Sequence, residues 1–217
     1  MVDLPTTLYL KTMLRILILT LAIAFLGIAA ATEHAPENTT AEQLIDRLHN
    51  TLLEVMRQAP ELGYAGRFDT LSPVIDDSFD FPTIARIVVG RHWKKLDEAQ
   101  QSRFLEVFAR LSKSNYAARF DGFSGESFKF LAAEPQKRDY LLIKTELIKS
   151  DGGVVPLSYV VHPTEAGNWV IVNVIADGVS DLSLKRADYS AVIRDEGFDS
   201  LVEKLNAKVS GHGDDPG

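Results

Sequence analysis

Few side chains in this sequence are placed to do chemistry, and the first candidate is a serine. Ser124 lies in Gly122-Phe123-Ser124-Gly125, which contains part of the nucleophile elbow G-x-S-x-G of serine hydrolases. The second glycine comes one position early, and the segment joins a predicted helix to a predicted strand, whereas the elbow joins a strand to a helix. The pattern therefore favours a serine in an ordinary turn.

Metal and nucleotide sites are not indicated either. The chain has no cysteine, which excludes thiolate ligands, cysteine nucleophiles and disulfides. No two histidines have the spacing that presents both rings to one metal; the five are His34, His49, His92, His162 and His212. Asp177 and Asp181 flank a short turn, but a calcium loop needs more oxygen ligands. Glycine-rich phosphate loops are absent, so the sequence predicts no cofactor.

One cluster of acid–base residues keeps an enzymatic alternative open. Asp139, Tyr140, Tyr159 and His162 come close to one another if residues 140–149 and 154–162 form a hairpin. An aspartate with a tyrosine or histidine in an apolar cone-shaped pocket could act on a hydrophobic small molecule, as in ketosteroid-isomerase-like folds. Adjacent strand residues point to opposite faces, so not all four can face one pocket.

The composition is that of a globular protein. Of the 217 residues, 46% are hydrophobic and 24% are charged. Lysine and arginine number 23 against 30 aspartates and glutamates, for a net charge of −7. A chain this acidic is not expected to bind nucleic acid, since binders of nucleic acid carry basic patches.

The N-terminus has the pattern of a secretory signal peptide. Lys11 and Arg15 precede an apolar run at 16–28, and Ala29-Ala30-Ala31 then offers an A-x-A cleavage site. The run is about 13 residues long, short of the ~20 that cross a bilayer, which disfavours the alternative of a membrane anchor. We expect a cleaved signal peptide at 1–31, a flexible lead-in at 32–40 and export to the periplasm.

The first half of the remaining chain predicts helices. Thr39 and Glu42 form a capping-box pattern ahead of a helix that runs to Gln58. A short second helix is expected around 68–75, after a break at 60–63. Asp80 begins a third helix that Gly90 ends, and Asp97 begins the longest one.

Hydrophobic alternation then replaces helical spacing. Four strands are predicted at 127–132, 140–149, 154–162 and 168–175, joined by short turns that make antiparallel hairpins. Helical spacing returns from Arg186, with a break at Gly197. The fold class is therefore α+β, with N-terminal helices, a four-stranded antiparallel meander and C-terminal helices. We expect one domain at 41–208 and a disordered tail at 209–217.

Several segments resemble one family in their order and spacing. The stretch 78–93, SFDFPTIARIVVGRHW, resembles the "FD…R…LG+YW" signature of the MlaC/toluene-tolerance (Ttg2-type) family, and 168–180 is similar to its "W+I.DV..EGVS". The resemblance extends over 41–208. His92 stands where tyrosine is commoner, and Asn173 where aspartate is. The Asp-Gly-Val-Ser-Asp-Leu form of 177–182 is closer to HpnM, the branch associated with hopanoid biosynthesis.

This resemblance implies a function in lipid transport. Members of the family are periplasmic lipid carriers that serve Mla-type ABC transporters. For this chain the resemblance implies a monomeric carrier of a phospholipid or hopanoid-type lipid, without cofactor or catalysis. Its partners would be an inner-membrane transporter complex and an outer-membrane donor or acceptor. The alternatives are an enzyme acting on a hydrophobic small molecule and an adaptor with a filled core, because sequence does not distinguish a hollow interior from a packed one.

For a carrier, the apolar face of the sheet is expected to enclose an elongated cavity. Alternation places one face of the third and fourth strands beside the longest helix. The predicted lipid-binding residues are Phe104, Phe108, Leu111, Val155, Leu157, Tyr159, Val161, Trp169 and Ile171. Asn173 is a polar exception on this face, either at the cavity mouth or bonded to backbone.

A basic cluster on this acidic chain is the candidate for partner docking. Arg86, Arg91, Lys94 and Lys95 lie in or just after the third predicted helix. Such a cluster can raise the association rate with an acidic partner or anionic headgroups. We expect it near the cavity mouth. The alternative is a solvated helix end, since basic residues favour helix C-termini.

Overall fold

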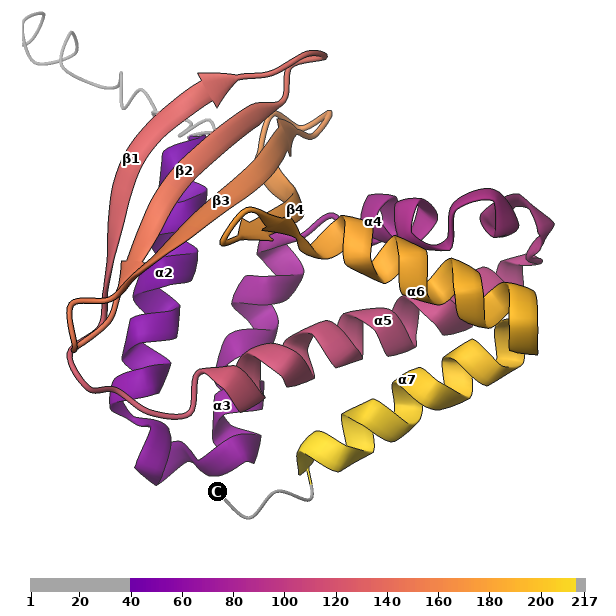
Figure 1. Ribbon diagram of the computed structural model, residues 1–217, viewed down its shortest axis with the longest axis horizontal. Helices are drawn as coiled ribbons and strands as arrows, with labels where there is room; N and C mark the ends of the chain where they lie inside the picture. The colour runs from indigo at the N-terminus through magenta and orange to yellow at the C-terminus, as the bar shows by residue number, and fades with distance from the viewer. Residues whose placement is uncertain (1–39, 214–217) are drawn as a thin grey trace, which may run out of the picture. The chain divides into compact units, whose positions relative to one another are not determined.

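The computed structural model describes residues 40–213, which begin with two helices (Figure 1). Helix α2 (Ala41–Arg57) starts at Thr40, whose hydroxyl accepts from the Gln43 backbone N–H while the Gln43 side chain accepts from the Thr40 N–H. This capping box lies one residue after the predicted box of Thr39 and Glu42, and Thr39 is outside the described residues. The predicted apolar stripe of α2 is buried.

The predicted break after α2 is a kink. Helix α3 (Ala59–Ser78) continues past it, with Gly63 in the left-handed region at φ 58°. Glycine adopts this conformation without steric cost, so the chain bends there and resumes its helix. The buried guanidinium of Arg67 holds the bend, since it donates to the carbonyls of Ala59 and Ala117 at 3.3 and 2.9 Å.

Two short helices lead to the longest helix. Helix α4 (Phe81–Val89) begins where Asp80 accepts from the Thr83 N–H, as predicted, and the 3₁₀ helix η1 (Gly90–Lys95) follows it. Helix α5 (Glu98–Arg119) begins with a capping box between Asp97 and Gln100. Its apolar stripe includes the buried Phe104 and Phe108.

The sheet is an antiparallel meander with one strand more than predicted. Its strands, in the order β1-β2-β3-β4-β5, are β1 (Ser127–Pro135), β2 (Leu141–Ile148), β3 (Val154–Pro163), β4 (Trp169–Ala176) and β5 (Val179–Ser180). The pairing shifts by one residue in β1 between Phe130 and Ala132, and in β4 between Ile171 and Asn173. The bulge in β4 decides which of its side chains face the helices.

Two helices complete the domain. Helix α6 (Asp181–Glu196) begins directly after β5, five residues before the predicted start at Arg186, because the Ser180 hydroxyl caps it by accepting from the Ser183 N–H. Helix α7 (Phe198–Gly213) extends past the predicted domain end at 208, and Val209 is buried. Residues 209–213 are therefore helical rather than a disordered tail, and 214–217 lie outside the described residues.

The helices cover one face of the sheet and pack on one another. Helix α2 contacts β1, β2 and β4, while α3 and α4 contact β4 (Figure 1). Helix α5 lies against α3 and α7, and α6 against α4. The predicted α+β class is confirmed. Within residues 40–213, no helix has the length and apolar character needed to cross a membrane.

Candidate functional site

A cavity of about 330 Å³ lies between the sheet and the helices. Its walls come from α2, α3, α4, α5, α6 and the last three strands. The apolar lining residues are Leu52, Ile75, Phe79, Phe81, Ile84, Phe108, Phe120, Leu157, Val172, Val174, Ala176, Val179, Leu182 and Leu184. The volume is at the lower end of the ~300–1,000 Å³ typical of small-molecule sites.

Aromatic rings form part of the apolar wall. Phe81 meets Phe108 edge-to-face at 6.0 Å, and Phe79 contacts Tyr116 in the same manner at 5.9 Å. The junction of α3 and α4 is attached to the sheet, since the Asp80 N–H donates to the Ile171 carbonyl at 3.0 Å. This attachment holds Phe79 and Phe81 beside β4.

Tyr159 of β3 lines the cavity with its hydroxyl bonded away from solvent. The hydroxyl and His49 Nε2 share a hydrogen bond of 2.9 Å, and the His49 ring stacks on Phe128 at 3.8 Å. Burial lowers the pKa of His49 to about 4 and raises that of Tyr159, so both groups are neutral at pH 7. No sequence motif singled out His49 as a functional residue. The signal available was its place on the apolar face of α2, between Leu48 and Leu52.

One end of the cavity is polar. Helix α5 contributes Ser112, Asn115, Tyr116 and Arg119 to it, and α6 contributes Asp181 and Lys185. Asn173 joins them and its Oδ1 accepts from the Ser180 hydroxyl at 3.1 Å and the Leu182 N–H at 3.2 Å. Of the two alternatives considered for Asn173, bonding to backbone is observed, and the residue also lines the cavity.

Three of the nine predicted lipid-binding residues line the cavity: Phe108, Leu157 and Tyr159. Four others, Phe104, Leu111, Val161 and Ile171, are buried in the core outside its wall. Val155 and Trp169 are half-buried near strand ends and do not line it. Alternation identifies a face of the sheet but not the depth at which the interior becomes hollow.

The bulge in β4 changes which of its later residues line the cavity. Regular alternation groups Trp169, Ile171 and Asn173 on the inner face. The bulge inserts one residue, so that Val174 pairs with Tyr159 and Ala176 with Leu157. Beyond the bulge Val174 and Ala176 line the cavity together with Val172 and Asn173, whereas Trp169 and Ile171, which precede the bulge, do not.

The structure does not bring the enzymatic candidates together at the cavity. Of Asp139, Tyr140, Tyr159 and His162, only Tyr159 lines it. His162 Nε2 instead bonds to the Asp80 carboxylate at 3.0 Å, next to the start of α4. Ser124 is exposed in the loop before β1, as a turn serine would be. Among residues 40–213 no group of three or more acidic or histidine side chains is arranged to hold a metal ion.

The predicted docking cluster is exposed, and none of its four residues lines the cavity. Arg86 is on α4, and Arg91, Lys94 and Lys95 are on η1. Gly90, at the start of η1, lies against the side chain of Arg186 on α6, one residue after Lys185 of the cavity lining. A place for this cluster around the cavity mouth stays a prediction.

A sheet and helices that enclose an apolar cavity with one polar end define an α+β binding domain for a hydrophobic ligand. The profile of the MlaC protein family matches residues 46–207. The chain belongs to the MlaC family.

Two curated proteins are similar in sequence. The intermembrane phospholipid transport system binding protein MlaC of Haemophilus influenzae is 22% identical over 127 residues, which cover 57% of this chain and 59% of that protein. The chain thus matches less than two thirds of that relative's length. The toluene tolerance protein ttg2D of Pseudomonas putida is 25% identical over 185 residues, covering 85% of this chain and 83% of that protein.

A solved structure shares the fold. The phospholipid-binding protein from Ralstonia solanacearum, in complex with a phospholipid, superposes with a TM-score of 0.68. The match covers 81% of this chain and 99% of that chain at 18% sequence identity. At that identity the likeness shows the common α+β fold.

Proposed function

We propose that this chain is a carrier that holds a membrane lipid in its cavity and moves it between membranes. The observation that carries the proposal is the apolar cavity between the sheet and the helices, in a chain of the MlaC family. The relatives that match it are named for phospholipid transport and for toluene tolerance, and the similar solved structure contains a phospholipid.

The energetics require such a cavity. A diacyl lipid has some thirty methylenes, so its passage through water costs roughly 20 kcal/mol or more at about 0.8 kcal/mol per methylene. A carrier has to offer an apolar wall nearly as favourable as the bilayer but not more favourable, so that the lipid can leave again. The aromatic and aliphatic lining supplies this wall.

The cargo, location and partners extend this proposal. We infer export to the periplasm by the predicted signal peptide at 1–31, which lies outside the described residues. The expected partners are an Mla-type ABC transporter complex at the inner membrane and an outer-membrane donor or acceptor, met by a monomeric carrier. Phospholipid is the cargo that the similar structure supports, and a hopanoid-type lipid is the alternative derived from the HpnM-like segment 177–182.

Analysis of the bound lipid tests the proposal. The protein is purified from its native periplasm, extracted with organic solvent and analysed by mass spectrometry with a count of lipid per protein. About one phospholipid per protein supports the carrier, and a hopanoid in its place supports the HpnM-type cargo. A clean extract contradicts lipid carriage and favours the adaptor. Chemical turnover of the bound molecule contradicts it in favour of an enzyme.

A further inference from the structure

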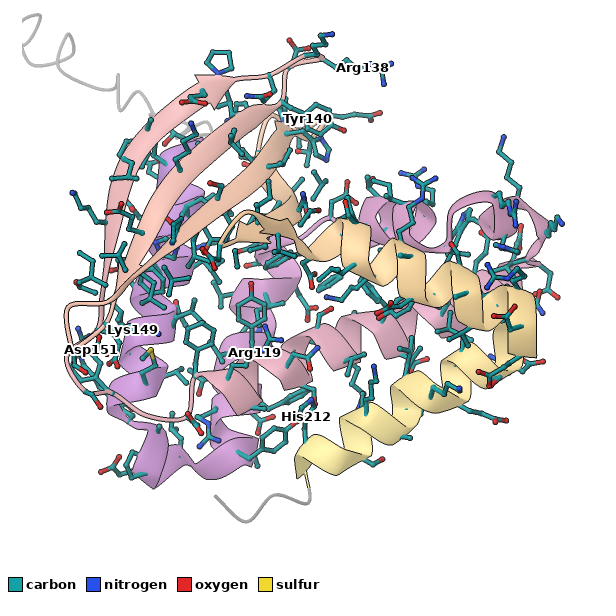
Figure 2. The ribbon with its side chains drawn as sticks, viewed as in Figure 1. Arg119, Arg138, Tyr140, Lys149, Asp151 and His212 are labelled. Carbon is teal, nitrogen blue, oxygen red and sulfur yellow. The ribbon has the colours of Figure 1, made fainter. Side chains whose placement is uncertain are left out.

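The cavity changes from apolar to polar along helix α5. Phe108 lines its apolar part, and Ser112, Asn115, Tyr116 and Arg119 follow at the spacing of one helix face. Arg119 is at the end of α5 from which the chain runs on to β1 (Figure 2). The side chains of α5 thus give the cavity a direction, with a polar end at the C-terminus of this helix.

The charges at this end sum to one positive charge. Arg119, Asp181 and Lys185 are the formally charged residues of the lining, in a chain whose net charge is −7. Lys185 forms an ion pair with Asp181 one turn away on α6. Arg119 forms no hydrogen bond or ion pair within residues 40–213, so the N–H groups of its guanidinium are available to a ligand.

Tyr116 supplies a further donor. Burial, and then the charge of Asp181, raises the pKa of its hydroxyl, which stays protonated. The ring is fixed by a stack on Phe120 at 5.7 Å and an edge contact with Phe79. The hydroxyl has no hydrogen-bond partner among the residues the structure describes. Because Tyr116 lines the cavity, this hydroxyl is placed to donate to an oxygen of a ligand held there.

We propose that Arg119, assisted by Lys185 and the Tyr116 hydroxyl, binds the phosphodiester group of the lipid at the polar end of the cavity. A guanidinium matches phosphate with two parallel N–H···O bonds, which a lipid without phosphate cannot accept. The net positive charge of the lining matches the single negative charge of a phosphodiester. Asp181 opposes the anion, and its pairing with Lys185 reduces that opposition.

This inference rests on the proposed function and adds a selectivity to it. The acyl chains occupy the apolar wall whatever the headgroup, whereas Arg119 contributes only for a lipid that carries phosphate. The carrier is then selective for phosphodiester lipids over neutral lipids of equal chain length, a triterpenoid included.

Binding of two lipids with identical acyl chains tests this selectivity. Phosphatidylglycerol and diacylglycerol are each titrated into delipidated protein, and native mass spectrometry gives the bound fraction. Arg119→Gln is expected to weaken phosphatidylglycerol about 10- to 100-fold, the range of charge-assisted hydrogen bonds, and to change diacylglycerol less than about twofold. Arg119→Lys restores part of the loss, and Tyr116→Phe gives a smaller one. Arg110→Gln is the control, since Arg110 is exposed on the same helix and outside the cavity lining.

Three outcomes would overturn the inference. Unchanged phosphatidylglycerol binding by Arg119→Gln removes the phosphate contact, and an equal loss for both lipids makes Arg119 part of the general wall. Glycerophosphate that binds as tightly as the intact lipid identifies a site for free phosphate esters instead of a headgroup site. If the wild-type protein binds neither lipid, the proposed function itself fails, which is a distinct result.

Discussion

Lowering the pH from 7 to 4.5 should destabilise this protein through one buried histidine. His49 is 5% exposed, and its ring lies between Phe128 and the Tyr159 hydroxyl. No carboxylate within residues 40–213 pairs with it. Burial lowers the pKa of His49 from 6.5 to about 4, so the folded protein resists protonation that the unfolded chain accepts.

The sign and size of the effect follow from this difference. Between pH 6.5 and 4 the unfolded chain binds the extra proton, so the free energy of unfolding falls as the pH falls through this window. At about 1.4 kcal/mol per pH unit, the full window corresponds to roughly 3 kcal/mol. Lowering the pH from 7 to 4.5 covers most of this window, so we expect the free energy of unfolding to fall by about 2 to 3 kcal/mol.

Urea denaturation followed by circular dichroism measures the loss. The free energy of unfolding is determined at pH 7 and 4.5 for the wild type and for His49→Gln, whose amide does not titrate. The carboxylates common to both proteins cancel in the comparison. The wild type should lose about 2 to 3 kcal/mol more than the variant. An equal loss in the two proteins would refute the assignment of the acid sensitivity to His49.

Three further changes separate the cavity wall, the core and the docking surface. Leu157→Trp fills part of the cavity and should reduce the amount of co-purifying lipid while the circular dichroism spectrum stays native. The control Leu131→Trp, at an exposed position, should leave the lipid content unchanged. Equal lipid content in the two variants would contradict the assignment of Leu157 to the cavity wall. Phe104→Ala removes a fully buried ring outside the wall and should cost about 3–5 kcal/mol in urea denaturation while the lipid per folded protein is unchanged. Lys94→Glu with Lys95→Glu should slow lipid transfer between reconstituted donor and acceptor membranes at low salt, where screening is weak, and leave lipid content intact. A wild-type rate for this double variant, or equal slowing by Lys137→Glu with Arg138→Glu on the distant β1–β2 turn, would remove the docking role.

The fold was largely predictable because its signals are local. Caps at Asp80 and Asp97 define helix starts through bonds to residues three positions on, and alternation with short turns defines the meander. The errors lie where a local signal has more than one structural outcome. Gly63 marked a helix end, and the contacts of Arg67 turn it into a kink. Polar composition suggested a tail after 208, and the burial of Val209 continues α7 through that region.

The candidate site was predictable only in part because it depends on depth and on distant contacts. The stripe of α5 identified Phe108, and the alternation of β3 identified Leu157 and Tyr159. The bulge in β4 has no clear sequence signature, and it brings Val174 and Ala176 to the cavity. Nor does periodicity distinguish Phe104, which fills the core, from Phe108, which lines the cavity.

The sequence by itself determined the α+β order of elements, the acidic charge and the resemblance to a lipid-carrier family, because propensity, periodicity and motif spacing are properties of neighbouring residues. Only the tertiary structure decided that the interior is hollow, that His49 meets Tyr159 110 positions away, and that Arg119 and Lys185 share the polar end of the cavity. Those features arise where separate elements meet. Their geometry is set by helix crossing, strand register and one inserted residue, none of which a local pattern specifies.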